Sequence, residues 1–192
     1  MKEGLRIGWA LCGSFCTLST VCEEMERFVA AGAEVTPIVS ENVATVDTRF
    51  GTAASVMARL RTITGREPLC SLPAVEPIGP KGWFDVLIVA PCTGTTLGKL
   101  ANGISNTPVT LAVKSHLRGG RPVVLGVATN DALGASLRNI ALLKNTKHLY
   151  LVPMAQDDVA KKPNSLVAVW EQLSPAVAAA LAGTQMQPLW WV

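Results

Sequence analysis

Short runs of almost entirely apolar residues alternate along this chain with segments in which apolar residues recur every three or four positions. The first pattern is typical of β-strands buried on both faces, and the second is typical of amphipathic helices. Their alternation predicts βαβ units, in which helices join parallel strands and cover both faces of one sheet. The predicted fold class is therefore α/β, with a doubly wound parallel sheet in three layers. The expected strands are 5–11, 34–39, 85–90, 121–127 and 148–152.

The predicted helices fill the intervals between these strands. Ser14 is expected to cap the first helix, whose apolar face runs from Leu18 to Val29. Asn130 or Asp131 is expected to begin a later helix that ends near residue 144. Four prolines between residues 66 and 84 predict a long irregular connection. The remaining expected helices are 52–63, 96–101, 108–117 and 166–181.

The composition limits the class of protein. At 192 residues the chain fits one domain, expected to span 1–192. Hydrophobic residues make up 49% and charged residues only 16%, whereas about 25% charged is typical. A chain with so few charges is expected to bury apolar surface in a homo-oligomer. The net charge is +3, but the sequence contains no clusters of basic residues, which argues against a nucleic-acid partner.

Targeting and redox features point to the cytoplasm. No apolar run approaches the roughly 20 residues of a membrane span, so no membrane partner is expected. The first expected strand begins too early to leave room for a signal peptide. Five cysteines without a CxxC pair are more typical of packed free thiols than of disulfides. The two histidines offer too few ligands for zinc, so no metal is expected. His116 is expected at the end of a helix, where it is interpreted as a favourable partner of the helix dipole.

The carboxyl ends of the expected strands select the candidate site, because ligands of open parallel sheets bind there. Hydroxyls or amides occur in most of the loops that follow the strands, although in any one loop they could simply be helix caps. Thr93, Thr95 and Thr96 precede a short helix, whose N-terminus favours an anion such as a phosphate. Gly13-Ser14, after the first strand, could contact the same phosphate. Neither GxGxxG nor GxxxxGK[ST] is present, which disfavours NAD and P-loop nucleotides.

Two further segments carry possible chemistry. Residues 153–165 are either a solvated turn or a flap that presents Lys161, Lys162 and Asn164 to a carboxylate substrate. Residues 184–192 form an apolar tail with Trp190 and Trp191, expected to pack on its own subunit or to insert into a neighbour.

Residues 90–110 also carry a family pattern, formed by Pro91, Thr93, Thr96, Lys99, Ala101, Asn102, Gly103, Ile104 and Thr110. This segment resembles the PASANT-type motif of the flavoproteins that include flavin-containing cysteine decarboxylases and flavin prenyltransferases. Thr95 stands where that motif usually has asparagine. Gly13-Ser14 and Ser40 resemble the family's first and second phosphate-side loops. The resemblance covers roughly residues 5–155 and implies a Rossmann-like flavoprotein fold, bound FMN and oligomers built from trimers.

The resemblance also implies a set of site residues. The flavin ring is expected near Phe15, Cys92 and residues 128–130, with the phosphate at the glycine and hydroxyl loops. Asn130 and Cys92 are the candidate catalytic residues, although Cys92 has no obvious base beside it and a packed or flavin-adjacent thiol is favoured. The expected cofactor-binding residues are Gly13, Ser14, Phe15, Ser40, Asn42, Cys92, Thr93, Gly94, Thr95, Thr96, Ala128, Thr129 and Asn130.

Two departures bear on the activity. The decarboxylases carry PxMNxxMW after the fourth strand, of which this chain keeps only Asn130, and residues 43–52 contain no counterpart of their catalytic histidine. These departures count against a stand-alone decarboxylase, which is therefore only an alternative function. A non-catalytic scaffold is the other alternative.

Residues 152–158 and 162–166 resemble a subgroup of the family that forms one component of a two-component oxidoreductase in sporulating bacteria. That resemblance implies a partner chain that binds NADP(H), a small dicarboxylate substrate, and a location in the mother-cell cytoplasm.

Overall fold

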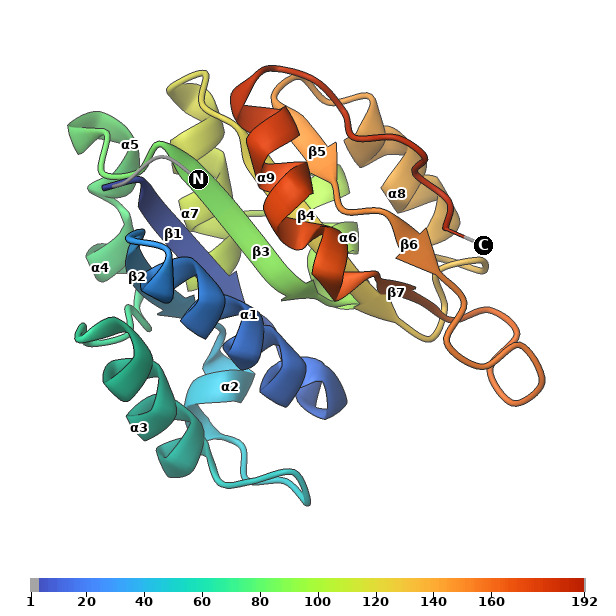
Figure 1. Cartoon of the computed structure of the whole chain (residues 1–192), viewed down its shortest axis with the longest axis horizontal. Helices are drawn as coiled ribbons and strands as arrows, with labels where there is room; N and C mark the ends of the chain where they lie inside the picture. Colours follow the sequence, from blue (N-terminus) through green and yellow to red (C-terminus); the bar gives the residue numbers. More distant parts are fainter. Residues whose placement is uncertain (1–3, 192) are drawn as a thin grey trace.

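The computed structural model describes residues 4–191, which fold as a central sheet between two layers of helices (Figure 1). The sheet order is β2-β1-β3-β4-β7-β6, and β5 also pairs with β4. Pairing among β1 to β5 is parallel, so the predicted doubly wound α/β fold is confirmed. Within the described residues the strands are β1 (Arg6–Leu11), β2 (Glu34–Val39), β3 (Val86–Cys92), β4 (Val123–Thr129), β5 (Leu149–Leu151), β6 (Met154–Ala155) and β7 (Leu166–Ala168).

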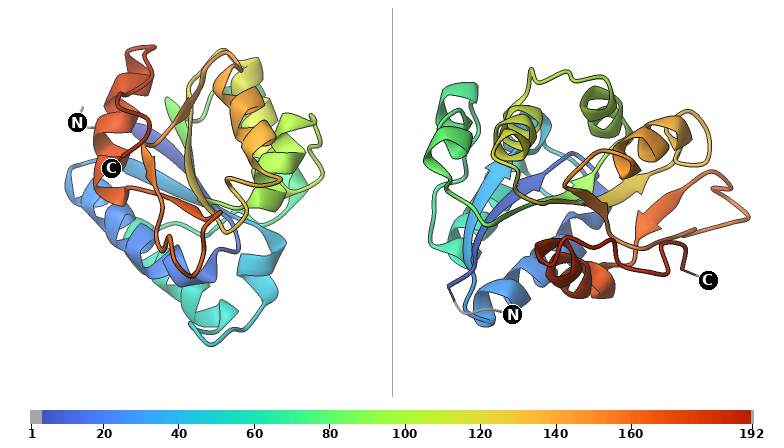
Figure 2. Two further views of the ribbon diagram at one scale, coloured as in Figure 1. Left: turned by 90° about the vertical axis from the view of Figure 1, so that its right-hand side faces the viewer. Right: turned by 90° about the horizontal axis from the view of Figure 1, so that it is seen from above.

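Two clusters of buried apolar side chains fill the spaces on either side of the sheet. Helices α1 (Leu18–Ala30), α3 (Ala53–Thr64) and α9 (Leu173–Leu181) contribute to one cluster. The opposite cluster receives side chains from α4 (Leu72–Val75), α5 (Ile78–Lys81), α6 (Gly94–Ala101), α7 (Pro108–Arg118) and α8 (Leu137–Lys144). Figure 2 shows the two layers, with α1 and α9 on one side of the sheet and α6, α7 and α8 on the other.

Trp9 is the largest completely buried side chain, and it joins the sheet to the first helix. Its ring meets that of Phe28 edge to face, with 5.3 Å between centroids. Its indole Nε1 donates a hydrogen bond to the carbonyl of Ala90 at 3.0 Å, so the one polar group of this buried side chain has a partner.

The far end of the sheet differs from the prediction. Residues 166–168 were expected to begin a helix, but they form β7, and the helix begins only at Leu173 after the 3₁₀ turn η2 (Trp170–Gln172). β7 runs antiparallel to the last residues of β4, and β6 runs antiparallel to β7. Because β5 covers only the first half of β4, the unpaired second half accepts this strand. The two antiparallel pairs at this end were not predicted.

The C-terminal tail lies along β6 of its own chain. Met154 donates its backbone N–H to Leu189, and Trp191 donates to Met154, both at 2.9 Å. Trp190 and Trp191 nevertheless remain 48% and 39% exposed.

Two helix starts were also predicted wrongly. The Ser14 side chain caps no helix, because residues 15–17 form the 3₁₀ turn η1 (Phe15–Thr17) before α1 begins. Residues 130–136 are turns, because the carboxylate of Asp131 accepts hydrogen bonds from the hydroxyls of Thr129 and Ser136 instead of capping a helix. The segment predicted as irregular, 66–84, contains the short helices α4 and α5.

Strand β3 continues past the proline at which it was expected to end. Its pairing with β4 shifts register between Val89 and Cys92. The hydrogen-bond ladder between the two strands therefore needs no backbone N–H at Pro91, where proline has none. The carbonyl of Pro91 accepts a hydrogen bond from Cys12 at 3.2 Å. Cys92 is consequently the last residue of a buried strand and not part of an open loop. No helix within residues 4–191 combines the length and the apolar character needed to cross a membrane.

Candidate functional site

Two adjoining cavities lie where the strands β1 to β4 end. The larger, of about 460 Å³, is bordered by the loops after β1, β3 and β4 and by the segment before β7. The smaller, of about 260 Å³, is bordered by the loops after β1, β2 and β3. Gly13, Thr93 and Thr95 line both, so the two form one continuous site. Its position at the carboxyl ends of the strands is the one expected for a ligand of this topology.

The structure brings together all of the predicted cofactor-binding residues except Cys92. The larger cavity is lined by Gly13, Ser14, Phe15, Thr93, Gly94, Thr95, Ala128, Thr129 and Asn130. The smaller cavity adds Ser40, Asn42 and Thr96.

Cys92 was a candidate nucleophile, and its geometry does not support that role. Its side chain is completely buried and lines neither cavity. Burial holds the pKa of the thiol well above its ordinary value, so the thiol stays protonated. The thiol that lines the larger cavity is that of the exposed Cys16, one of the cysteines expected to be packed free thiols.

The N-terminus of α6 supplies polar groups to both cavities. Thr93 caps the helix, its Oγ1 accepting from the Thr96 N–H at 3.4 Å. The hydroxyl of Thr96 is buried and donates to the Cys12 sulfur at 3.2 Å, so it is already occupied within the protein. Thr95 is exposed and lines both cavities. Of the three predicted hydroxyls, that of Thr95 is therefore the best placed for a ligand.

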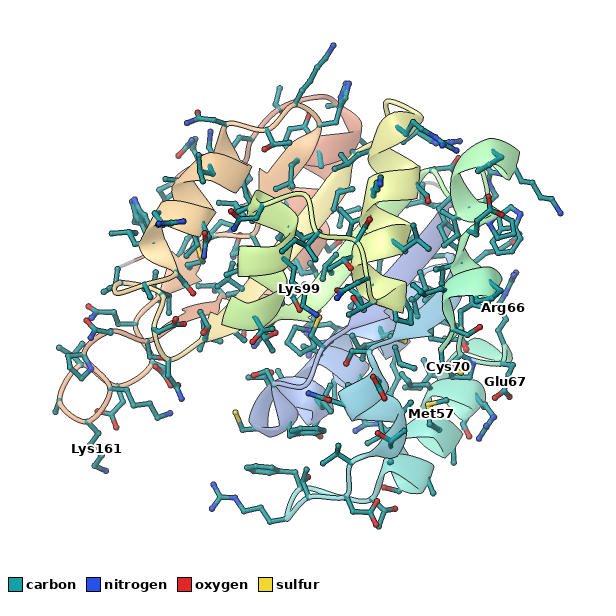
Figure 3. The ribbon with its side chains drawn as sticks, turned by 180° about the vertical axis from the view of Figure 1, so that it is seen from behind. Met57, Arg66, Glu67, Cys70, Lys99 and Lys161 are labelled. Carbon is teal, nitrogen blue, oxygen red and sulfur yellow. The ribbon has the colours of Figure 1, made fainter. Side chains whose placement is uncertain are left out.

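Lys99 lies one turn further along α6 and lines the smaller cavity (Figure 3). It belongs to the sequence motif, but it was not predicted as a site residue. With Lys99, the smaller cavity combines an ammonium group, the hydroxyls of Ser40 and Thr95, and the N-terminal end of a helix. This set of donors suits a phosphate group.

Gly94 holds the loops after β3 and β4 close together. A Cβ atom built there would lie 2.8 Å from both Asp131 Oδ1 and Thr129 Oγ1. Those two atoms are themselves hydrogen-bonded at 2.5 Å, and Ser136 Oγ donates to Asp131 at 3.0 Å. Only glycine leaves this network of hydrogen bonds undisturbed at the first residue of α6.

Asn130 is exposed and lines the larger cavity. Its Oδ1 accepts from the hydroxyl of Ser165 at 3.5 Å, which connects the loop after β4 to the segment before β7.

Of the three predicted substrate residues, only Lys162 lines the larger cavity. Its ammonium group forms an ion pair with Asp157 at 2.8 Å. Burial alone would raise the pKa of Asp157, but hydrogen bonds from Lys162 and Ser165 hold it below its ordinary value. Lys161 points away from the body of the protein at the tip of its loop (Figure 3), and Asn164 lines neither cavity. Neither residue forms part of the cavity wall, and their contact with a substrate stays a prediction.

Phe50 is an aromatic residue of the larger cavity that was not predicted from the sequence. It follows α2 (Glu41–Thr45) in a connection without regular periodicity, so no local pattern marked it. Its side chain is 53% exposed.

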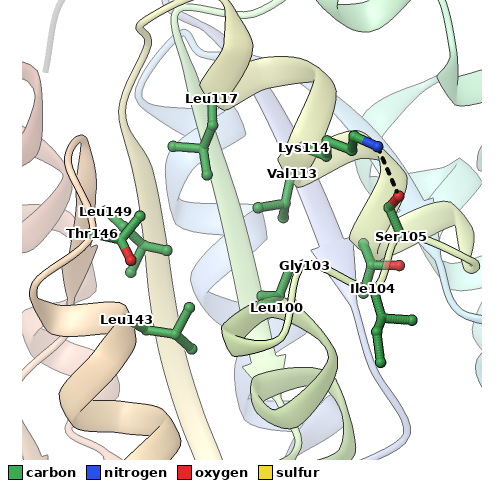
Figure 4. Close-up of a pocket in the computed structure, with 11 residues that line it drawn as sticks. Leu100, Gly103, Ile104, Ser105, Val113, Lys114, Leu117, Leu143, Thr146 and Leu149 are labelled. Carbon is green, nitrogen blue, oxygen red and sulfur yellow. Dashed lines mark hydrogen bonds between the residues drawn. The ribbon is translucent and has the colours of Figure 1, made fainter.

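A separate cavity of about 250 Å³ lies between α6, α7 and α8 (Figure 4). Leucine side chains dominate its lining, and Lys114 donates to Ser105 at 3.4 Å on its rim. Ser105, Thr110 and Thr146 also line it, but none of its lining residues comes from the loops that follow β1 to β4. Within the described residues, no group of three or more His, Cys, Asp or Glu side chains is arranged to hold a metal ion.

His116 does not have the role expected at the end of α7. It is completely buried, and its Nε2 bonds to the carbonyl of Pro122 at 3.1 Å. Burial lowers its pKa to about 4, and the positive charge of Arg121 adds to that effect. A neutral imidazole gains little from the helix dipole.

Comparisons with known proteins agree with this geometry. The family described as Flavoprotein matches residues 1–179. The B subunit of dipicolinate synthase from Bacillus subtilis (strain 168) is 43% identical over 187 residues, which cover 97% of this chain and 94% of that protein. The crystal structure of the B subunit of dipicolinate synthase from Bacillus halodurans C has a TM-score of 0.91 at 43% identity, covering 99% of this chain and 97% of that one.

A more distant structure shares the fold. The crystal structure of TvaF, an FMN-dependent cysteine decarboxylase from thioviridamide biosynthesis, has a TM-score of 0.57 at 25% identity, with 73% of this chain and 85% of that one covered. The resemblance predicted from residues 90–110 is thus confirmed over nearly the whole sequence, and the chain belongs to the flavoprotein family.

Proposed function

We propose that this chain binds FMN across the two adjoining cavities and acts as the B subunit of a dipicolinate synthase. The observation that carries the proposal is the continuous polar site at the strand ends, in a chain 43% identical over 97% of its length to the B subunit of a known dipicolinate synthase. The FMN dependence of the related TvaF supports the choice of flavin.

The residues present fit FMN. The phosphate would bind in the smaller cavity, held by Ser40, Thr95 and Lys99, with Gly13 permitting close approach of the backbone. The ring would occupy the larger cavity between Phe15 and residues 128–130, and Asn130 would donate to a flavin carbonyl or a substrate carboxylate. The larger cavity falls within the roughly 300–1,000 Å³ typical of small-molecule sites.

The reaction would convert dihydrodipicolinate to dipicolinate during sporulation, in the mother-cell cytoplasm. This oxidation removes two electrons and two protons from the ring, and FMN, when bound, can accept a hydride. An A subunit that binds NADP(H) would be the partner, and this chain would assemble with copies of itself as trimer-based oligomers. Lys162, on the wall of the larger cavity, would face a substrate carboxylate.

Titration of the apoprotein with FMN tests the cofactor assignment, with the flavin spectrum as readout. Lys99→Met should weaken FMN binding by about tenfold or more, because a charge-assisted hydrogen bond contributes roughly 1.5–3 kcal/mol. Lys144→Met, at the end of α8, is the matched control. Gly13→Leu should block binding, since even a Cβ there would lie 3.3 Å from the Phe15 ring. Absence of FMN binding by the wild-type chain would refute the assignment.

Reconstitution with the A subunit tests the reaction. Dipicolinate formation that requires both subunits, and that Gly13→Leu reduces, is the expected result. Carbon dioxide release from cysteine-ended peptides by this chain alone would instead favour the decarboxylase. Full activity of the assembled Gly13→Leu variant without bound flavin would favour the scaffold role.

A further inference from the structure

A tight turn at residues 48–51 places the Phe50 side chain at the edge of the larger cavity, with Arg49 next to it in the chain. Thr48 and Gly51 exchange backbone hydrogen bonds at 3.0 and 3.1 Å, and the Thr48 hydroxyl accepts from the Phe50 N–H at 3.1 Å. Arg49 and Phe50 are therefore the two central residues of a well-defined turn.

Both flanks of this turn are anchored to α3. Asp47 Oδ1 accepts from the Ala53 N–H at 2.8 Å, and Thr52 Oγ1 accepts from the Ser55 N–H at 3.1 Å. The turn is consequently held in place by side-chain hydrogen bonds on both sides, and its position next to the cavity is a property of the fold.

The turn presents an exposed aromatic ring with a cation against it. Phe50 lines the larger cavity and, with Phe15 and Cys16, also a neighbouring cavity of about 280 Å³. The guanidinium carbon of Arg49 lies 4.8 Å from the centre of the Phe50 ring, which is a cation–π geometry. Phe50 is still 53% exposed in this arrangement, so much of its ring remains available for contact.

Arg49 is better suited to a carboxylate than are the lysines of the site. The ammonium group of Lys162 is already paired with Asp157, and Lys99 lies in the smaller cavity, where a phosphate fits. Among the ion pairs found within residues 4–191, none involves Arg49. A guanidinium also presents two parallel donors that match a carboxylate.

We infer that Arg49 and Phe50 recognise the substrate: the Phe50 ring contacts a planar ring in the larger cavity, and Arg49 pairs with a carboxylate on that ring. This inference rests on the proposed function and adds to it the residues that bind the ring and one carboxylate of the substrate and of its aromatic product, pyridine-2,6-dicarboxylate. It also gives Arg49 the carboxylate-binding role that was expected of Lys161 and Asn164.

Calorimetric titration with pyridine-2,6-dicarboxylate tests the inference, on the full-length protein both with and without FMN. Arg49→Met removes the charge while keeping most of the side-chain length, and Phe50→Leu removes the ring. Arg118→Met, at the exposed last residue of α7, is the matched control. Circular dichroism of each variant verifies the fold.

We expect Arg49→Met to raise the Kd for the dicarboxylate by about tenfold or more, and Phe50→Leu by about fivefold, while the control stays within twofold of the wild type. The Kd for FMN should change less than twofold in Arg49→Met and in the control, because neither Arg49 nor Arg118 lines the smaller cavity, to which the phosphate is assigned. Unchanged dicarboxylate affinity of Arg49→Met, or no binding by the wild type in either state, would overturn the inference. Failure to bind FMN would instead refute the proposed function, and the two failures are distinguishable since the titrations are separate.

Discussion

Acidification should destabilise this protein through one buried histidine. His116 donates from Nε2 to the Pro122 carbonyl at 3.1 Å, while its Nδ1 is buried without a hydrogen-bond partner. Protonation would add an N–H at Nδ1 with no acceptor and a positive charge near Arg121. The folded protein therefore resists protonation of this ring, and its pKa falls from 6.5 to about 4.

The sign and size of the effect follow from proton linkage. Between pH 6.5 and about 4 the unfolded chain binds the proton and the folded protein does not, so the free energy of unfolding decreases as pH falls through this window. The contribution of His116 is fully present above pH 6.5. Each pH unit within the window is worth about 1.4 kcal/mol, so lowering the pH from about 7.5 to about 5 should cost about 2 kcal/mol.

Urea unfolding followed by tryptophan fluorescence at both pH values measures this loss. His116→Gln keeps an amide donor for Pro122 but cannot titrate, so its loss should be smaller than that of the wild type by about 2 kcal/mol. His148→Asn is the matched control, because His148 has φ 64°, a conformation that asparagine tolerates. Equal losses for the wild type and His116→Gln would refute the reasoning.

Two further predictions concern the site itself. Gly94→Ala should lower the free energy of unfolding by about 1–3 kcal/mol in urea and weaken FMN binding, because its Cβ would displace the hydrogen bonds around Asp131. Gly98→Ala is the control and should leave both stability and FMN binding unchanged, because its Cβ would lie 3.6 Å from the nearest atom. Equal stability of the two variants would contradict the close-contact argument. A thiol reagent should modify Cys16 before Cys92, as read by peptide mass spectrometry, and FMN should slow the reaction at Cys16; rapid labelling of Cys92 would contradict its burial.

Much of the site could be predicted because its residues follow strands that the sequence marks clearly. Each of β1 to β4 is an apolar run, and the hydroxyl and glycine residues after β1, β2 and β3 meet in one place once those strands are parallel neighbours. Lys99 could have been included from the motif, since it lies one helical turn from the capping Thr93. Phe50 carried no local signal of its role.

The sequence by itself determined the α/β class, the positions of the main strands along the chain and the family, because these depend on local periodicity and on a contiguous motif. Only the tertiary structure decided that residues 166–168 pair with the free half of β4, that Cys92 is buried beyond the register shift at Pro91, and that Phe50 lines the larger cavity with Arg49 against its ring. The physical reason is that each of these outcomes depends on which distant segment a residue meets, and pairing partners, burial and cavity walls are set by long-range contacts that local propensity does not encode.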